Sequence, residues 1–315
     1  ALHSTRPDLV TAMRNNSGKL SGGRAASRFR TSLATAQVAL SMALLMSAGL
    51  FVKSLWKVSR LDLGVKVDNV VTFALAPRRS GYDSLRSKTL FDRVEAELAA
   101  LPGVTGVTSA SVPLLAGNNW GNDVSVEGFK KDADTDDNSR FNEIGSDYFQ
   151  TIGVPLLAGR EFTASDAAGR PKVVVVNEAF AKKFGLGRDV VGKRMATGDT
   201  SVLDMEIVGL IKDAKYAEVK DVIPPVFYTP HRQDPRIGFM NFYARTAGEP
   251  KRLLRDVPAA IRRIDPNLPV EDLKTMPQQI RENVFMDRMI SILSAAFAIL
   301  ATILAAVGLY GVLAY

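Results

Sequence analysis

The last stretch of the sequence, residues 289–315, limits what this chain can be more than any other feature. It has no charged residue, and its polar members are Ser291, Ser294, Thr302 and two tyrosines. As a helix rising ~1.5 Å per residue, it is longer than the ~30 Å hydrocarbon core of a bilayer. A core helix of a soluble protein has one polar face, and this stretch has none. We therefore predict a transmembrane helix at 289–315.

A stalk helix, residues 276–288, is predicted to lead into this span. Thr275 is followed by Met276, Pro277 and Gln278, the pattern of a capping box with proline in the first helical turn. No proline follows Pro277, so we expect one continuous helix from Met276 through the membrane, a rigid rod of ~60 Å.

A second apolar span, residues 33–52, predicts a first transmembrane helix. Gln37 is its one strongly polar member, and it is rich in the small residues that let membrane helices approach closely. We expect the helix to continue to about residue 63 and to end at Gly64. The alternative of a signal peptide is disfavoured, because a long polar segment precedes the span, including a flexible turn at 17–23, and no small-residue cleavage site follows.

The formal net charge of +7 is concentrated at the N-terminal end. The basic residues of the segment 1–32 are Arg6, Arg14, Lys19, Arg24, Arg28 and Arg30, against Asp8 alone. A basic cluster beside a membrane span is an orientation signal, so it gives no reason to expect a nucleic-acid partner. It places 1–32 in the cytoplasm and the region between the spans outside it.

The region between the spans is predicted to have an α+β fold containing two strand–helix–strand units. A strand at 69–76 precedes a helix with Leu90, Phe91, Val94, Leu98 and Leu101 on one face. A strand at 239–245 precedes a helix with Leu253, Leu254, Val257, Ile261 and Ile264 at the same spacing. The two units bracket the region, as a first half at 65–118 and a second half at 233–275, one attached to each membrane helix.

A β-rich subdomain, residues 119–232, is predicted between these halves. Its expected strands are 123–128, 140–144, 172–176, 205–212 and 226–229. One short helix at 178–184 follows Asn177 as its N-cap and ends at Gly185. Residues 132–138 form an acidic loop.

Motifs that resemble ligand sites are weak here. Residues 187–193 fit the phosphate-loop spacing GxxxxGK, but Arg194 replaces the serine or threonine that holds magnesium, so a turn is the better interpretation. Asp132, Asp134, Asp136 and Glu143 match part of a calcium-loop template, but Asp137 stands where that loop needs glycine. We expect a solvated loop there, and no metal or cofactor.

Catalytic side chains are also scarce. There is no cysteine, which excludes disulfides, thiol catalysis and cysteine-ligated zinc. The two histidines, His3 and His231, lie on predicted opposite sides of the membrane, and His231 is interpreted as a surface loop residue. A Ser-His-Asp triad or a multi-histidine metal site is therefore hard to assemble, and we expect no catalytic residue.

Several segments together resemble the MacB/FtsX-type permeases of ABC transporters. They are 146–153 (SDYFQTIG), 155–163 (PLLAGREFT), 173–184 (VVVVNEAFAKKF), 191–194 (VGKR), 207–213 (IVGLIKD) and 308–315 (GLYGVLAY). The resemblance covers nearly the whole chain. It implies an extracytoplasmic core domain with a two-part, porter-like subdomain and an inserted, mostly β subdomain.

The two ends depart from that family. Such permeases have one membrane helix before the core domain and three after it, whereas two spans are present here. The expectation is a fragment from the second half of a duplicated orphan permease.

The resulting hypothesis is a non-catalytic permease subunit in the plasma membrane, multi-pass, with its large domain outside. Implied partners are a separate ABC ATPase subunit, a second permease copy or half, a periplasmic adaptor and the bilayer. Small residues on the second helix, Ala301, Ala305, Gly308 and Gly311, are its candidates for close helix packing. The alternative is a signalling receptor with two spans around a sensor domain; a membrane-tethered enzyme ranks third.

Overall fold

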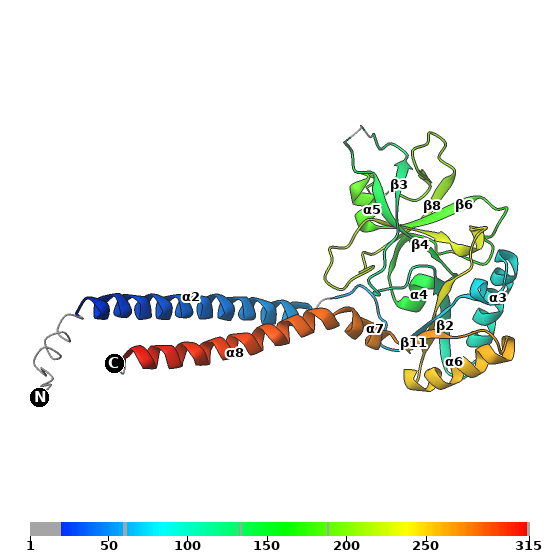
Figure 1. The fold of residues 1–315 in the computed structure, drawn as a ribbon. Helices are drawn as coiled ribbons and strands as arrows, with labels where there is room; N and C mark the ends of the chain where they lie inside the picture. Colours follow the sequence, from blue (N-terminus) through cyan, green and yellow to red (C-terminus); the bar gives the residue numbers. More distant parts are fainter. Residues whose placement is uncertain (1–19, 59–61, 131, 133, 188, 314–315) are drawn as a thin grey trace, which may run out of the picture. The chain divides into compact units, whose positions relative to one another are not determined.

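The chain divides into two units (Figure 1). The computed structural model describes residues 20–58, 62–130, 132, 134–187 and 189–313. The helical unit comprises Ala1–Arg60 and Met286–Tyr315, and the globular unit comprises Leu61–Phe285. Helices α2 (Leu20–Val58) and α8 (Phe285–Leu313) contain segments, Thr31–Leu50 and Arg288–Gly308, that are long and apolar enough to cross a membrane.

The first helix differs from the prediction at both ends. It begins at Leu20 and runs through Gly22 and Gly23, so the flexible turn predicted at 17–23 is wrong over its second half. A glycine in a helix costs about 1 kcal/mol relative to alanine, but extending an existing helix adds one backbone hydrogen bond per residue. The predicted continuation to residue 63 falls partly on 59–61, outside the described residues, and residues 62–63 are not helical.

The expectation of one unbroken helix from Met276 through the membrane is wrong. Helix α7 (Met276–Asn283) has Thr275 as its N-cap, as predicted, but Val284 separates it from α8. Asn283 accepts a hydrogen bond from the Val219 N–H and donates one to the Ala217 carbonyl, 3.2 Å in each case. These bonds hold the last turn of α7 on a neighbouring loop, and the helix restarts after one residue.

One part of the globular unit is an antiparallel sheet with strand order β11-β1-β10-β2. Its strands are β1 (Val70–Leu75), β2 (Val104–Ala110), β10 (Met240–Thr246) and β11 (Glu271–Thr275), and its helices are α3 (Ser84–Ala99) and α6 (Pro250–Ile264). Both strand–helix–strand segments are present. They interleave, because β10 lies between β1 and β2 while β1 lies between β10 and β11. This is the split βαβ arrangement.

The predicted apolar stripes form the core of this part. Leu90, Phe91, Val94 and Leu98 of α3 pack with Leu253, Val257 and Ile261 of α6 and with the sheet. Phe73 and Phe242 stack across β1 and β10 with ring centroids 5.4 Å apart. Leu101, Leu254 and Ile264 lie at the margin and are half-buried.

The second part of the globular unit is a closed β-barrel. Its strands are β3 (Gly121–Val126), β4 (Asn138–Ile144), β6 (Lys172–Asn177), β7 (Arg194–Thr197), β8 (Met205–Ile211) and β9 (Val226–Pro230). The pairings run β4-β3-β7-β8-β6-β9 and return to β4, with β4–β9 and β6–β8 parallel. Closure leaves these strands without a free edge.

The predicted strands of the insert are all present, and the short helix α5 (Glu178–Lys183) follows its Asn177 cap. The prediction missed β7, helix α4 (Tyr148–Ile152) and strand β5 (Leu156–Gly159), which pairs with β8. The 3₁₀ helices η1 (Pro77–Ser80) and η2 (His231–Gln233) complete the described elements. The barrel joins the sheet through the pairing of Ala110 with Ile144.

Candidate functional site

The segments that enter and leave the globular unit meet at one loop, residues 213–225, here called the root loop. The Lys215 N–H donates to the Leu63 carbonyl at 2.9 Å, on the entering side. On the leaving side, Asn283 of α7 bonds to Val219 and Ala217. The first strand after the entering segment, β1, and the last strand before α7, β11, are hydrogen-bonded neighbours in the sheet. The chain order attaches β1-α3-β2 to α2 and β10-α6-β11 to α7 and α8, and because the two units interleave, both attachments lie close to the same loop.

The entering segment is held by backbone contacts on both sides. Gly64 has φ +71°, and a Cβ built there would lie 2.6 Å from the Asp213 carbonyl oxygen. The Lys66 N–H donates to the Ile152 carbonyl at 2.8 Å. The Arg245 guanidinium donates to the Lys66 carbonyl and, at 2.7 Å, to the Thr151 carbonyl. The segment therefore connects the root loop to α4 and β10.

The leaving helix is held through a second layer of chain, residues 114–117. The Gln279 side chain of α7 donates to the Leu114 carbonyl, and the Leu114 N–H donates to the Tyr243 hydroxyl at 2.8 Å. The Leu115 N–H donates to the Tyr216 carbonyl of the root loop at 2.9 Å. A shift of α7 is thus opposed by bonds to the root loop and to β10.

The first turn of α5 clamps both ends of the root loop. At one end, Asp213 accepts from the Ala179 N–H at 2.9 Å and donates its own N–H to Glu178 at 3.1 Å. At the other end, Asn177 donates to the Pro224 carbonyl and accepts from the Val226 N–H, both at 2.9 Å. Burial, with the charge of Glu178, raises the pKa of Asp213.

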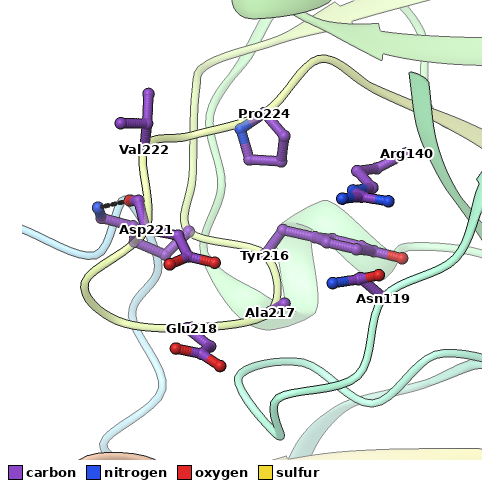
Figure 2. A pocket seen from close by; sticks show the side chains of 9 residues that line it. Asn119, Arg140, Tyr216, Ala217, Glu218, Asp221, Val222 and Pro224 are labelled. Carbon is purple, nitrogen blue, oxygen red and sulfur yellow. Dashed lines mark hydrogen bonds between the residues drawn. The ribbon is translucent and has the colours of Figure 1, made fainter. Parts of the chain in front are cut away.

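A small pocket of about 210 Å³ lies along the root loop (Figure 2). The Lys215 ammonium donates to the Asp221 carbonyl, which closes the loop on itself. Arg140 and Asn119 flank the Tyr216 side chain, whose hydroxyl donates to the Phe141 carbonyl at 2.7 Å. Burial raises the pKa of Tyr216, so the phenol remains a neutral donor. The Tyr216 hydrogen bond thus holds the root loop on β4. Among the residues that line the pocket, no nucleophile is paired with a base.

His231 is buried, and its interpretation as a surface loop residue is wrong. It is 1% exposed, in η2, with Nε2 3.8 Å from Glu95 Oε1 of α3. Among the described residues, neither imidazole nitrogen has a hydrogen-bond partner. Glu95 also accepts from the Ser109 hydroxyl at 2.8 Å and contacts Arg232 at 3.4 Å. This polar cluster joins α3 and β2 of the sheet to the end of β9 in the barrel.

Replacing two glutamates near this junction, one at a time, with neutral glutamine is expected to affect the melting temperature differently at the two positions. His231, Ser109 and Arg232 outweigh the opposing effect of burial and lower the pKa of Glu95. Burial and the charge of Asp234 raise the pKa of Glu143. At pH 7 we therefore expect Glu95→Gln to lower the melting temperature and Glu143→Gln to leave it unchanged or raise it.

The pH dependence gives the check. The lowered folded-state pKa of Glu95 means that its contribution is present above its unfolded pKa and is lost as the pH falls through the folded pKa. For Glu143 the sign is reversed, because its contribution is lost as the pH rises through its folded pKa. Melting curves of both variants and the parent at acidic and neutral pH test this. Shifts of the same sign at pH 7 would contradict it.

The ligand-like sequence motifs do not form sites in the described residues. Gly187 and Gly192 have φ +66° and +88°, and Gly192 occupies a turn before β7. Asp136 pairs with Lys183 at 2.8 Å, whereas Glu143 accepts from Ser111 on the other side of β4. Over the described ranges, no group of His, Asp and Glu could hold a metal ion. His3 lies outside them.

In the helical unit, α2 contacts α8 at two of the small residues named from the sequence, Ala301 and Gly308. Ala301, Ala305 and Gly308 are half-buried, whereas the burial of Gly311 is not among the described features. The Ser41 hydroxyl has two carbonyl acceptors within reach. One is Gln37 of its own helix at 2.8 Å, and the other is Ala301 of α8 at 3.0 Å. A Cβ on Gly308 would lie 2.6 Å from Gln37 Oε1.

The contact also includes positions that the sequence reasoning missed. Buried or half-buried residues of α8 recur at seven-residue intervals, in the series Ser291, Ala298, Ala305 and the series Ser294, Ala301, Gly308. On α2, Gln37, Ser41, Leu44 and Ala48 have the same spacing. A heptad of small residues was the available signal, because it places one narrow face of each helix against the other.

Comparison with known proteins gives one family match. The family model of the MacB-like periplasmic core domain matches residues 31–260. No curated protein sequence matches the chain.

Three solved structures are similar to parts of the chain. The chain is similar to the periplasmic region of MacB from Actinobacillus actinomycetemcomitans, with 16% identity over 72% of this chain and 98% of that one, at a TM-score of 0.45. It is similar to a domain of a putative permease from Porphyromonas gingivalis (17% identity, 66% and 91% covered, TM-score 0.40). It is also similar to the extracellular domain of the noncanonic ABC-type transporter YknZ from Gram-positive bacteria (14% identity, 66% and 100% covered, TM-score 0.42).

Proposed function

Because the chain belongs to the MacB-like periplasmic core domain family of ABC transporter permeases, we propose that it couples ATP hydrolysis by a separate subunit to movement of its extracytoplasmic domain. The family is a non-catalytic membrane component that works with ABC ATPases. We propose that the movement serves export or mechanotransmission. The assembly would include the ATPase, a second permease copy or half, and a periplasmic adaptor, in the plasma membrane with further spans.

The observation that carries the coupling proposal is the convergence on the root loop. The loop bonds to the entering segment at Leu63 and to the leaving helix at Asn283, and α5 clamps it at both ends. A displacement of either connecting segment therefore reaches the same loop. The break at Val284 means that the force on the leaving side passes through the side-chain bonds of Asn283, in addition to the backbone.

The test removes the Asn283 side chain in the assembled transporter. The chain has no cysteine, so Val222→Cys, at a position 90% exposed on the root loop, accepts a single spin label. We expect ATP to change the mobility of this label, and Asn283→Ala to reduce that change by at least half. ATP hydrolysis should continue, because the variant leaves the ATPase subunit unaltered. Electron paramagnetic resonance in nanodiscs provides the measurement.

Two controls keep the result specific. Gln278→Ala removes an exposed α7 side chain that bonds only within the helix, to Glu282, and should leave the ATP response intact. A label at Leu85 on α3, which is 76% exposed, should respond less than the one on the root loop. A full response in Asn283→Ala would show that the root loop does not carry the coupling. A parent protein without any ATP response would reject the ATPase-coupled function itself.

A further inference from the structure

The barrel has a cavity at one end, and every barrel strand contributes to its wall. The lining residues include Asn122 of β3, Glu143 of β4, Lys172 of β6, Thr197 of β7, Met205 of β8 and Thr229 of β9. Residues 233–236, which follow η2, form the rest of the rim. The cavity volume is about 300 Å³. Barrel mouths of this size are a common place for small ligands.

One wall of this barrel mouth is aromatic. Phe141 of β4 and Phe227 of β9 stack with ring centroids 5.6 Å apart and planes at 18°, and both line the cavity. Trp120 packs on Phe141 at 5.7 Å and is 45% exposed. Phe227 is 1% exposed, so the half-buried Phe141 offers most of the flat apolar surface, and ring faces attract cations.

The lining also carries two carboxylates, Glu143 on the same face of β4 as Phe141, and Asp234 in the rim. Glu143 is half-buried, and it accepts a hydrogen bond from the Ser111 hydroxyl at 3.0 Å. Asp234, in the rim, accepts the Arg236 N–H at 3.0 Å. Within the described part of the chain neither carboxylate has an ion-pair partner, whereas Lys172 is paired with Asp204.

The charge balance of the cavity therefore favours a cation. The negative charge of Asp234 is one of the causes that raise the pKa of Glu143, so the two groups repel each other across the site. Of the positive groups in the lining, Lys172 is paired with Asp204, and the charge of exposed Arg236 lowers the pKa of Glu143 by less than burial and Asp234 raise it. Among the described residues no group of three His, Asp or Glu side chains could hold a metal ion, and the aromatic wall suits an organic body.

We propose that the barrel mouth binds a small organic amine, with its ammonium group between Glu143 and Asp234 and its apolar body against Phe141 and Phe227. This site lies apart from the root loop, and it goes beyond the coupling function. It would make the barrel a receptor for a soluble ligand outside the cytoplasm.

The test uses the full chain in detergent and three probes of nearly equal shape. Trp56→Phe leaves Trp120 as the sole tryptophan, beside the aromatic wall. The probes are 2-phenylethylamine, the neutral 2-phenylethanol and the anionic 3-phenylpropanoate. We expect a saturable change in Trp120 fluorescence with the amine, at least tenfold weaker binding of the alcohol, and no binding of the anion.

Variants identify the charged groups. Glu143→Gln can still accept the Ser111 hydrogen bond, and it should weaken amine binding at least fivefold. Asp234→Asn, in the rim, keeps an acceptor for the Arg236 N–H and should also weaken it. Glu206→Gln is the matched control, because Glu206 is an exposed β8 carboxylate outside the cavity lining. Its affinity should equal that of the parent.

The proposal is overturned by any of three results. The first is the absence of a saturable response to the amine. The second is equal affinity for the amine and the alcohol, which would mean apolar binding only. The third is unchanged amine affinity in both Glu143→Gln and Asp234→Asn, with melting curves showing that both are folded. None of these results depends on the ATPase, so they leave the coupling proposal standing.

Discussion

Replacing Gly64 with alanine is expected to destabilise the globular unit by about 2–5 kcal/mol, from about 1–2 for the left-handed backbone and 1–3 for overpacking. The new Cβ would lie 2.6 Å from the Asp213 carbonyl oxygen and 2.8 Å from the Ala214 Cα. Both are backbone atoms of the root loop and cannot rotate away. At about 2–4 °C per kcal/mol for a unit of this size, the melting temperature should fall clearly.

A matched glycine separates the close approach from the backbone strain. Gly81 has a similar φ of +82°, but among the described residues nothing lies within 4 Å of a Cβ built at that position. Gly81→Ala should therefore lose only the conformational part, about 1–2 kcal/mol. Thermal melting of the full chain, followed by Trp120 fluorescence in a Trp56→Phe background, gives the comparison. Equal losses in the two variants would show that the root loop does not pack tightly against residue 64.

Replacing Asn177 with alanine is expected to cost about 3–5 kcal/mol, because buried polar groups left without partners cost about 1–3 kcal/mol each. The side chain caps α5 through the Phe180 N–H at 2.9 Å, and it also bonds to Pro224 and Val226. Asn177 is 2% exposed, so water cannot replace these bonds without opening the structure. Thermal melting and amide hydrogen exchange at Val226 should both report the loss.

Asp83 provides the control for capping alone. It caps α3 by accepting from the Arg86 N–H at 2.7 Å, at an exposed position. Asp83→Ala should cost about 1 kcal/mol, the usual value of a lost N-cap. A second variant, Asn177→Asp, keeps the acceptor for Phe180 and Val226 but turns a buried carboxylate oxygen toward the Pro224 carbonyl, so it should also lose more stability than Asp83→Ala. If Asn177→Ala were no worse than Asp83→Ala, Asn177 would be a cap and nothing more.

Long periodic segments could be predicted from the sequence because one stripe of apolar residues suffices to define them. The α3 and α6 stripes and the two apolar helices are of this kind, and so are most barrel strands. The Asn177 cap was also readable, since its partner is Phe180, in the same helix. Each of these features depends on residues close together in the chain.

The features that the sequence did not predict depend on distant partners. The N-terminal amides of α4 are capped by Glu161, which accepts from Phe149 at 3.1 Å and Gln150 at 3.0 Å after a turn of the chain. His231 is buried because α3 supplies Glu95. Helix α7 ends where Asn283 meets the root loop. No local pattern records such contacts.

The candidate site was predictable only in part, for the same reason. Small residues on the second apolar helix could be recognised in the sequence, and Ala301 and Gly308 have contacts with Ser41 and Gln37 of α2. The root loop was not visible, because its bonds join segments far apart in sequence. A barrel mouth likewise needs strand order before its lining can be named.

The interleaved sheet sets an order of events for a newly made chain. Strand β1 appears early, but its neighbours β10 and β11 come from the far end of the region, after the whole barrel. The barrel strands are contiguous in sequence, so they can associate before β10 and β11, the pairing partners of β1, have been synthesised. Contacts of such long sequence separation form slowly, and an unpaired strand invites aggregation in the meantime. Biogenesis of this domain thus ends with two late strands, β10 inserted between β1 and β2, and β11 paired on the other side of β1.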